Sequence, residues 1–111
     1  MLRWGRKTIK KMKRKFFRSN IIAFGTPTGT VTDSTKIKIT GTIGWTKAYT
    51  AAGAAYRQKG NTAWNYKAAS SLAVDVTTGA LTAGKTYEVA LYLKRGSFYD
   101  YSTIIEVEIP S

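Results

Sequence analysis

The sequence has no cysteine and no histidine among its 111 residues. The absence of cysteine excludes a disulfide framework and a thiolate metal site, so nothing argues for an oxidising compartment and synthesis in the cytoplasm is expected. The absence of histidine removes the commonest general base and metal ligand near neutral pH. We therefore predict that the chain is not an enzyme, needs no cofactor or metal, and acts on no small-molecule substrate.

Acidic residues are also few, with six Asp and Glu against 18 Lys and Arg. Glu106 and Glu108 are two residues apart, so on a strand they share a face and form the best candidate for a paired-carboxylate or cation site. The interpretation we favour is that they are solvated side chains of an edge strand, facing Glu88, Lys94 or Arg95 across the sheet. No catalytic or metal-binding residue is therefore assigned.

A long apolar run is missing as well. After the basic start of the chain, only residues 21–24 are apolar before Gly25 and Pro27, whereas the hydrophobic region of a signal peptide needs roughly 7 to 15 such residues. No segment approaches the about 20 apolar residues of a membrane-spanning helix. We expect neither a signal peptide nor a membrane span.

What the sequence has in excess is positive charge at one end. Residues 1–19 hold nine of the 18 Lys and Arg and none of the acids, a charge of +9, while residues 20–111 hold nine basic and six acidic side chains, which leaves +3. This distribution predicts a basic N-terminal arm over 1–19, with anionic partners, and a folded domain over 20–111. The predicted partner-binding residues of the arm are Arg3, Trp4, Arg6, Lys7, Lys10, Lys11, Lys13, Arg14, Lys15, Phe16, Phe17 and Arg18.

The conformation and partner of the arm stay open at this point. Its apolar residues Leu2, Ile9, Met12 and Phe16 are spaced to stripe one side of a helix, but clustered like charges oppose helix formation, so an extended or partly helical arm that orders on a partner is expected. The same residues suit an acidic groove between protein subunits, the phosphates and bases of a nucleic acid, or the surface of an anionic membrane.

From residue 20 onward, β-branched and aromatic residues alternate with polar ones between Gly and Asn turn signals, a pattern typical of short strands. The clearest strand has Tyr87, Val89, Leu91 and Leu93 on one face and Glu88, Ala90, Tyr92 and Lys94 on the other. Other strands are predicted at 21–24, 37–45, 52–59, 62–69, 72–76 and 105–109, with turns at 59–61 and 95–97. Seven strands predict an all-β fold, a single antiparallel sandwich.

Aromatic residues gather around the predicted hairpin at 95–97. Phe98, Tyr99 and Tyr101 follow the turn, and Tyr92 lies on the outer face of the preceding strand. Rings at a loop tip are good anchors for a protein interface, so these four residues are candidate interface aromatics. The alternative is that they pack the core at one end of the sandwich.

Two segments carry a family resemblance. The segment LTAGKTYEV places Leu81, Gly84 and Tyr87 in the order leucine, glycine turn and tyrosine, and AAYRQKGNTAW places a tyrosine strand before a turn and a tryptophan strand. Together with the strand pattern over 36–109, they resemble a fibronectin type III domain of the bacterial kind. The resemblance implies a seven-stranded immunoglobulin-like sandwich in which Leu81 packs under a corner and the Tyr87 hydroxyl bonds to nearby backbone.

The pairing of a basic arm with one such domain resembles small auxiliary capsid proteins of crAss-like phages. That resemblance implies a structural virion protein, a decoration or minor capsid subunit made in the host cytoplasm, which binds the major capsid protein or other virion proteins. The alternative is a nucleic-acid-binding module, ribosome-associated or genome-packaging, that works through the arm. A carbohydrate-binding or adhesion domain fits less well, because no export signal is found.

Overall fold

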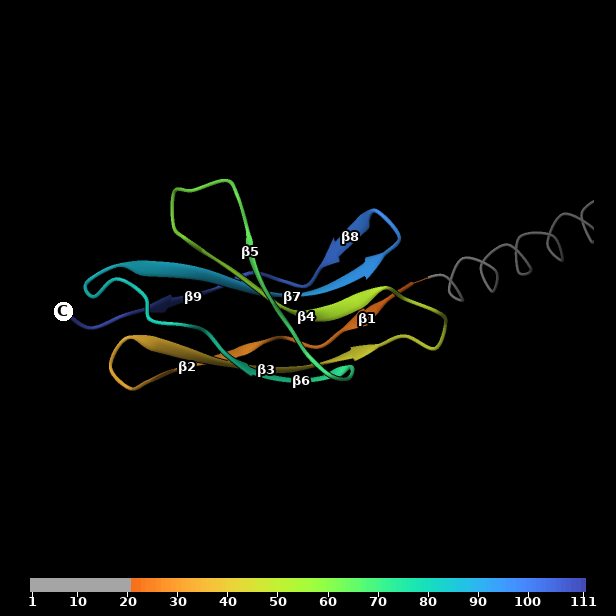
Figure 1. Ribbon diagram of the computed structural model, residues 1–111, viewed down its shortest axis with the longest axis horizontal. Coiled ribbons are helices and arrows are strands. Elements are labelled where there is room, and N and C mark those ends of the chain that lie inside the picture. Colours follow the sequence, from red (N-terminus) through yellow and green to blue (C-terminus); the bar gives the residue numbers. More distant parts are fainter. Residues whose placement is uncertain (1–20) are drawn as a thin grey trace, which may run out of the picture.

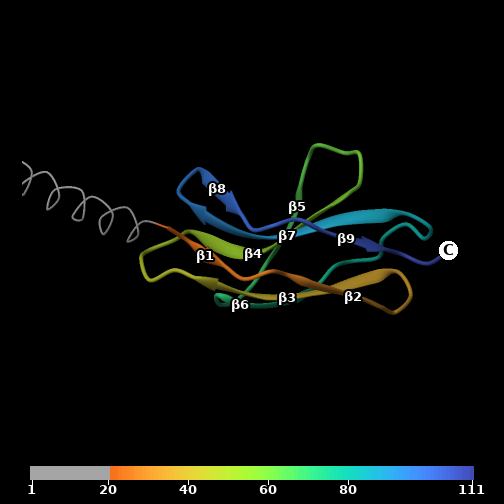
Figure 2. The same ribbon diagram turned by 180° about the vertical axis from the view of Figure 1, so that it is seen from behind.

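The computed structural model describes residues 21–111, which form nine β-strands and no helix. The strands are β1 (Ala23–Phe24), β2 (Thr28–Thr32), β3 (Lys36–Gly44), β4 (Ala51–Gln58), β5 (Asn65–Ala68), β6 (Ala73–Thr77), β7 (Thr86–Arg95), β8 (Phe98–Tyr101) and β9 (Ile105–Glu108). They build two antiparallel sheets that lie as two layers, which can be followed from both sides (Figure 1 and Figure 2). The expectation of an all-β antiparallel fold is confirmed, and the two layers are compatible with a sandwich.

Each sheet is organised around one long central strand. In the first sheet, β1 and β2 pair with successive parts of one edge of β3, and β6 pairs with the opposite edge. In the second sheet, β4 lies on one side of β7, with β5 outside it, and β8 and β9 pair in succession along the other side. Since two edge positions are each filled by two short strands, the described residues form nine strands where the sequence predicted seven.

The core lies between the sheets and follows the predicted alternation. Ile37 and Ile39 of β3, and Val89, Leu91 and Leu93 of β7, are 0% exposed. Burying an aliphatic side chain of this size stabilises a fold by about 1.5 to 3 kcal/mol, so these inward faces hold the layers together. In the last strand, the inward residues pack against the core and the two glutamates stay exposed, as predicted.

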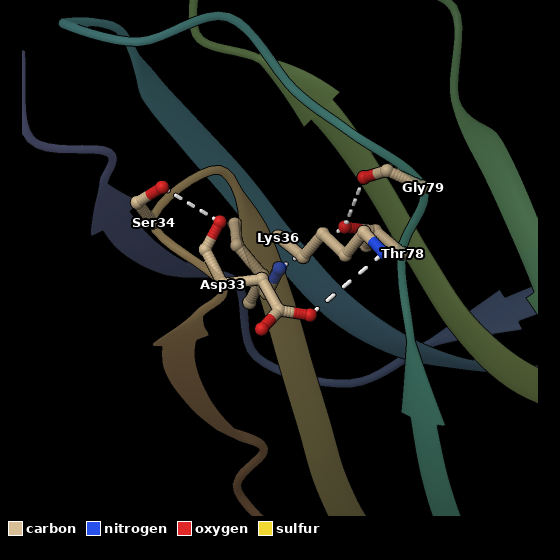
Figure 3. Close-up of polar contacts among 6 residues, drawn as sticks. Asp33, Ser34, Lys36, Thr78 and Gly79 are labelled. Atoms are coloured by element: carbon tan, nitrogen blue, oxygen red, sulfur yellow. Dashed lines mark hydrogen bonds and ion pairs between the residues drawn. The ribbon is translucent and has the colours of Figure 1, made fainter.

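The turn between β2 and β3 uses backbone that most side chains avoid. Asp33 and Ser34 have φ angles of 48° and 58°, and the Ser34 hydroxyl donates to the Asp33 carbonyl at 2.7 Å (Figure 3). The Asp33 carboxylate also lies 3.8 Å from the ammonium of Lys36. Close by, the buried Thr78 hydroxyl accepts a hydrogen bond from the Ile37 N–H at 3.0 Å and donates one to the Gly79 carbonyl at 2.8 Å. Asp33 is therefore a turn residue, and the turn lies next to the Ile37–Thr78 hydrogen bond that joins β3 to the end of β6.

The corner that leads into β7 has a tyrosine at its centre. Tyr87 is 6% exposed, and its hydroxyl accepts a hydrogen bond from the Thr82 N–H at 3.0 Å. Gly84 has a φ of 78°, a value that glycine adopts without strain, and Leu81 packs against the core. The three residues singled out in the sequence thus lie together where the chain enters the second sheet.

Candidate interaction site

The outer face of the second sheet carries the densest group of aromatic residues. Alternation places Tyr92 and Lys94 of β7 on this face, and the register of β8 sets Tyr101 opposite Tyr92 and Tyr99 opposite Lys94. From the far side of β4, Tyr66 of β5 reaches the same face. Rings from strands far apart in the sequence are thereby brought together on one side of the molecule.

Four side chains form a connected cluster of rings, which we call the aromatic ladder: Trp64, Tyr66, Tyr99 and Tyr101. The Trp64 and Tyr101 rings are 5.6 Å apart between centroids, Tyr101 and Tyr99 are 6.3 Å apart, and Tyr99 and Tyr66 are 5.0 Å apart, with angles between planes of 22°, 11° and 29°. The hydroxyls of Tyr66 and Tyr101 form a hydrogen bond of 2.6 Å. Each ring pair adds about 0.5 to 1.5 kcal/mol beyond area burial, so the ladder is an ordered unit.

Tyr92 is the base of the ladder. The ring of Tyr66 meets it edge-on at 4.9 Å, and Tyr92 is 4% exposed. It lies on the outer face, as predicted, but the ladder covers it, so its ring is not available at the surface. Partial burial, and then the hydrogen bond with Tyr101, raise the pKa of Tyr66 to about 12, and burial raises the pKa of Tyr92 as well.

Two cations contact rings of the ladder. The Arg57 guanidinium is 3.9 Å from the centroid of the Trp64 ring and is held there by a 2.8 Å bond from its Nε to Glu88. The second cation is Lys94, whose Nζ lies 5.3 Å from the centroid of the Tyr99 ring. Cations attract the electron-rich faces of aromatic rings, so both contacts help to hold the ladder rings in place.

The opposite side of the β7–β8 hairpin forms a second aromatic group, which we call the hairpin end. The predicted turn is confirmed, with a φ of 63° at Gly96, and beyond it Phe98 is 73% exposed. Arg95 lies with its guanidinium 4.9 Å from the Trp45 ring and 2.7 Å from the Asp100 carboxylate. The hairpin end, comprising Trp45, Arg95 and Phe98, thus offers an exposed ring beside a fixed cation.

The hairpin end lies where the described chain begins. Strand β1 pairs with the last residues of β3, directly before Trp45, and the Gly96 N–H donates to the Thr50 hydroxyl at 2.8 Å, which ties the hairpin to the β3–β4 loop. Figure 1 shows the start of β1 and the β8 hairpin at one end and the C-terminus at the other. Any contact made by residues before 21 therefore starts from the end that exposes Phe98.

The predicted site residues have different outcomes. The arm residues, from Arg3 to Arg18, lie outside the described part of the chain. Phe98 is exposed at the hairpin end, while Tyr99 and Tyr101 join Tyr92 in the ladder. The carboxylate of Glu106 is 2.9 Å from Lys59 Nζ, an exposed ion pair, and Glu106 lies opposite Glu88, one of the positions predicted for it.

Sequence reasoning missed the role of Trp64 and Tyr66. Both were assigned to the centre of a strand over 62–69, but β5 covers only Asn65–Ala68 and Trp64 lies in the loop before it. The reason is that Trp64 stacks on Tyr101 and Arg57 instead of continuing the strand. The only feature in the sequence that could have indicated this role is the pair of aromatic residues, Trp64 and Tyr66, two positions apart after the turn at Gly60.

Comparisons with protein-family models, curated proteins and solved structures give no match for this chain. Within residues 21–111, no helix is long and apolar enough to cross a membrane, and no three His, Cys, Asp or Glu side chains gather as a metal site. The chemistry that the described residues offer is that of a contact surface, built from rings and cations.

Proposed function

We propose that the chain is an auxiliary structural protein of a virus particle, a decoration or minor capsid subunit, which binds major capsid subunits through its basic arm and its β-sandwich. The virion setting comes from the sequence resemblance alone. The observation that carries the binding role is the hairpin end, where Phe98 is 73% exposed at the end of the domain from which the arm continues. An exposed ring and a charged arm then meet one partner from the same side.

The distribution of charge supports a division of labour between the two parts. Five of the six acids lie in ion pairs, with Lys36, Lys38, Arg57, Lys59 and Arg95. Residues 20–111 then keep a net charge of +3, whereas residues 1–19 carry +9. Opposite charge on a partner would steer its association with the arm. An interface on a domain of this size offers only on the order of 800 Å² per partner, so the arm adds contacts that the folded domain lacks.

We also infer a fibronectin type III-like topology for the body. When β1 with β2, and β8 with β9, are each counted as one interrupted strand, three strands fall in one sheet and four in the other. The bond from Thr82 N–H to the Tyr87 hydroxyl fits the corner tyrosine of that family. A solved structure with a different strand order would contradict this assignment.

Loading onto genome-free shells tests the function. Genome-free shells of a candidate major capsid protein are mixed with the full chain or with a chain lacking residues 1–19. We expect the full chain to load at a fixed ratio and the truncated chain to lose loading. A matched control keeps the length of the arm but replaces its nine Lys and Arg by Gln, and it should load as poorly as the truncated chain.

The outcomes separate the proposal from its alternative. A nucleic-acid-binding module would load only genome-filled particles, and its binding to mixed-sequence duplex DNA would fall with salt at a log–log slope of about −0.9 per neutralised phosphate. Salt-sensitive DNA binding alone decides nothing, because any polycation shows it. Absence of the full chain from genome-free shells would overturn the capsid proposal.

A further inference from the structure

The hydroxyls of Tyr66 and Tyr101 meet on the outer face of the second sheet, 2.6 Å apart. We propose that these two tyrosines form an oxidative modification site, at which a one-electron oxidant joins their rings through a carbon–carbon bond. The product is a dityrosine cross-link within one chain, and it ties β5 to β8. This inference goes beyond the proposed function and does not depend on it.

The fold brings together two rings that are far apart in the sequence. Tyr66 lies in β5 and Tyr101 in β8, and these strands are separated in the sheet by β4 and β7. Between them, the same face carries Ala55 and Ala90, whose small side chains leave room for rings above β4 and β7. In Figure 1, the β4–β5 loop and the β8 hairpin both stand on the outer side of the second sheet. The two tyrosines therefore extend over this face from opposite sides.

Neighbouring rings hold the pair in place. Tyr99 is in stacking contact with both rings, with its centroid 5.0 Å from that of Tyr66 and 6.3 Å from that of Tyr101. The buried Tyr92 meets Tyr66 edge-on at 4.9 Å. Two reactants that are held together couple far more readily than two that must first meet by diffusion, so coupling within one chain is favoured over coupling between chains.

Accessibility distinguishes this pair from the other tyrosines. Tyr66 and Tyr101 are 39% and 37% exposed, so a dissolved oxidant reaches both rings. Tyr92 is only 4% exposed. Tyr49 is 41% exposed, but within residues 21–111 it makes no contact with another ring. Exposure and a hydroxyl contact thus coincide at Tyr66 and Tyr101.

The reaction is the oxidative coupling of two phenols. Each ring loses one electron to the oxidant and its hydroxyl proton to water, which leaves two phenoxyl radicals with unpaired electron density on the carbons ortho to the oxygen. One ortho carbon of each ring forms the new bond, and the proton on each joined carbon then moves to its oxygen and restores the phenol. When hydrogen peroxide, activated by a peroxidase, is the oxidant, two tyrosines and one peroxide give one dityrosine and two waters. Because ortho carbons neighbour the carbon that carries the hydroxyl, the contact between Tyr66 and Tyr101 brings the reacting atoms near each other.

The cross-link supplies a covalent tie that the composition of the chain otherwise lacks. The sequence has no cysteine, so a disulfide cannot form. Strand β5 has four residues, all exposed, and it pairs with β4 along one edge. Joining residues 66 and 101 also closes a loop in the unfolded chain and so lowers its entropy, as a disulfide does. The modified protein should therefore be more stable, with β5 fixed to the β8 hairpin.

Peroxidase oxidation of the dilute full chain tests the inference. The chain is treated with a haem peroxidase and hydrogen peroxide, and the monomer is isolated, digested with trypsin and analysed by mass spectrometry. We expect the monomer to lose the mass of two hydrogen atoms and to gain dityrosine fluorescence. Cleavage after Lys59, Lys67 and Arg95 should yield a cross-linked peptide that joins residues 60–67 to 96–111. The urea midpoint of the oxidised monomer should rise.

Conservative variants identify the two rings. Tyr66→Phe and Tyr101→Phe each remove one hydroxyl and should lose the cross-linked peptide. Tyr99→Phe keeps both hydroxyls of the pair, and Tyr49→Phe is the matched control at an exposed tyrosine away from the ladder, so both should form the cross-linked peptide as wild type does. Circular dichroism before oxidation checks that each variant is folded.

The other outcomes overturn the inference. Dityrosine found only between chains, or through Tyr49, would show that the hydroxyl contact does not direct coupling. A cross-linked peptide that survives in Tyr101→Phe and is lost in Tyr99→Phe would move the site to the stacked pair of Tyr66 and Tyr99. An oxidised monomer without dityrosine would leave the contact as a hydrogen bond alone. None of these measurements uses a capsid protein, so their failure leaves the proposed function standing.

Discussion

Gly41 and Leu91 face each other across the core and offer a direct test of how the two sheets pack. A Cβ atom added at Gly41 would lie 2.7 Å from Cδ1, 3.1 Å from Cδ2 and 3.3 Å from Cγ of Leu91. All three atoms belong to one side chain that is 0% exposed. Gly41→Ala should therefore overpack the core and lower the free energy of unfolding by about 1 to 3 kcal/mol. This loss is expected even though alanine reduces the conformational entropy of the unfolded chain, which by itself would stabilise the fold.

The reverse change at Leu91 should leave a cavity. Leu91→Ala removes a fully buried side chain and is expected to cost about 2 to 5 kcal/mol. In the double variant, the methyl group introduced by Gly41→Ala has room and fills part of that cavity, so the two losses should not add. We expect the double variant to be more stable than the sum predicts by about 1 to 3 kcal/mol, within the range measured for residues in contact.

Urea unfolding of the full chain, followed by circular dichroism, measures all four corners of this cycle. The slope of the transition should stay the same in each variant, since the surface exposed on unfolding hardly changes. If the losses in free energy of unfolding of the two single variants add to within about 0.5 kcal/mol, β3 and β7 do not pack against each other as the sandwich interpretation requires. A Gly41→Ala variant as stable as wild type would refute that packing as well.

Three further changes probe the corner, the ladder and the path of β5. Tyr87→Phe leaves the Thr82 N–H without its acceptor and should cost about 1 kcal/mol in urea unfolding; no loss would mean that this bond is absent in solution. The pKa of Tyr66 is raised to about 12 and that of Tyr92 is raised as well, so the folded state holds these two protons more tightly than the unfolded chain does. This contribution to the free energy of unfolding should be fully present below about pH 10 and be lost between about pH 10 and 12. Urea unfolding at a series of pH values checks this, and a free energy of unfolding that stays constant over that range would contradict it. Gly53→Ala should prevent folding or shift β5, since its Cβ would overlap backbone atoms of β5, and no side-chain change should rescue it; a native circular dichroism spectrum would contradict the path of β5.

The central strands could be predicted from the sequence because large aliphatic residues occupy every second position in them. Val89, Leu91 and Leu93 alternate with Ala90, Tyr92 and Lys94 in β7, and the structure buries the three aliphatic side chains. Strand β2 was not predicted, because its inward positions are Gly29 and Val31, and a glycine carries no hydrophobic signal. The structure explains that glycine, since a Cβ there would lie 2.6 Å from a methyl group of Val107.

The candidate site was only partly predictable. The position of Phe98, Tyr99 and Tyr101 after a hairpin turn could be inferred from a glycine and the strands around it. That Trp64 would stack on Tyr101 could not, because the contact depends on which strands flank β7, and β5 and β8 are separated in the sheet by two other strands. That Tyr66 would pack on Tyr92 on the outer face of β7 could not be inferred either, because nothing in the local sequence shows that β5 reaches this face.

The interrupted edges of the two sheets bear on how such a protein behaves at high local concentration. Exposed edge strands are templates on which other chains add as extra strands, and long, flat edges are the starting points of fibres. Here the edges are formed by β1 with β2, by β6, by β5, and by β8 with β9, and none of these strands exceeds five residues. Breaks at residues 25–27 and 102–104 divide the two longest edges into short pieces, a feature that reduces edge-to-edge pairing. Many copies of the domain can therefore stand side by side without polymerising through their sheets.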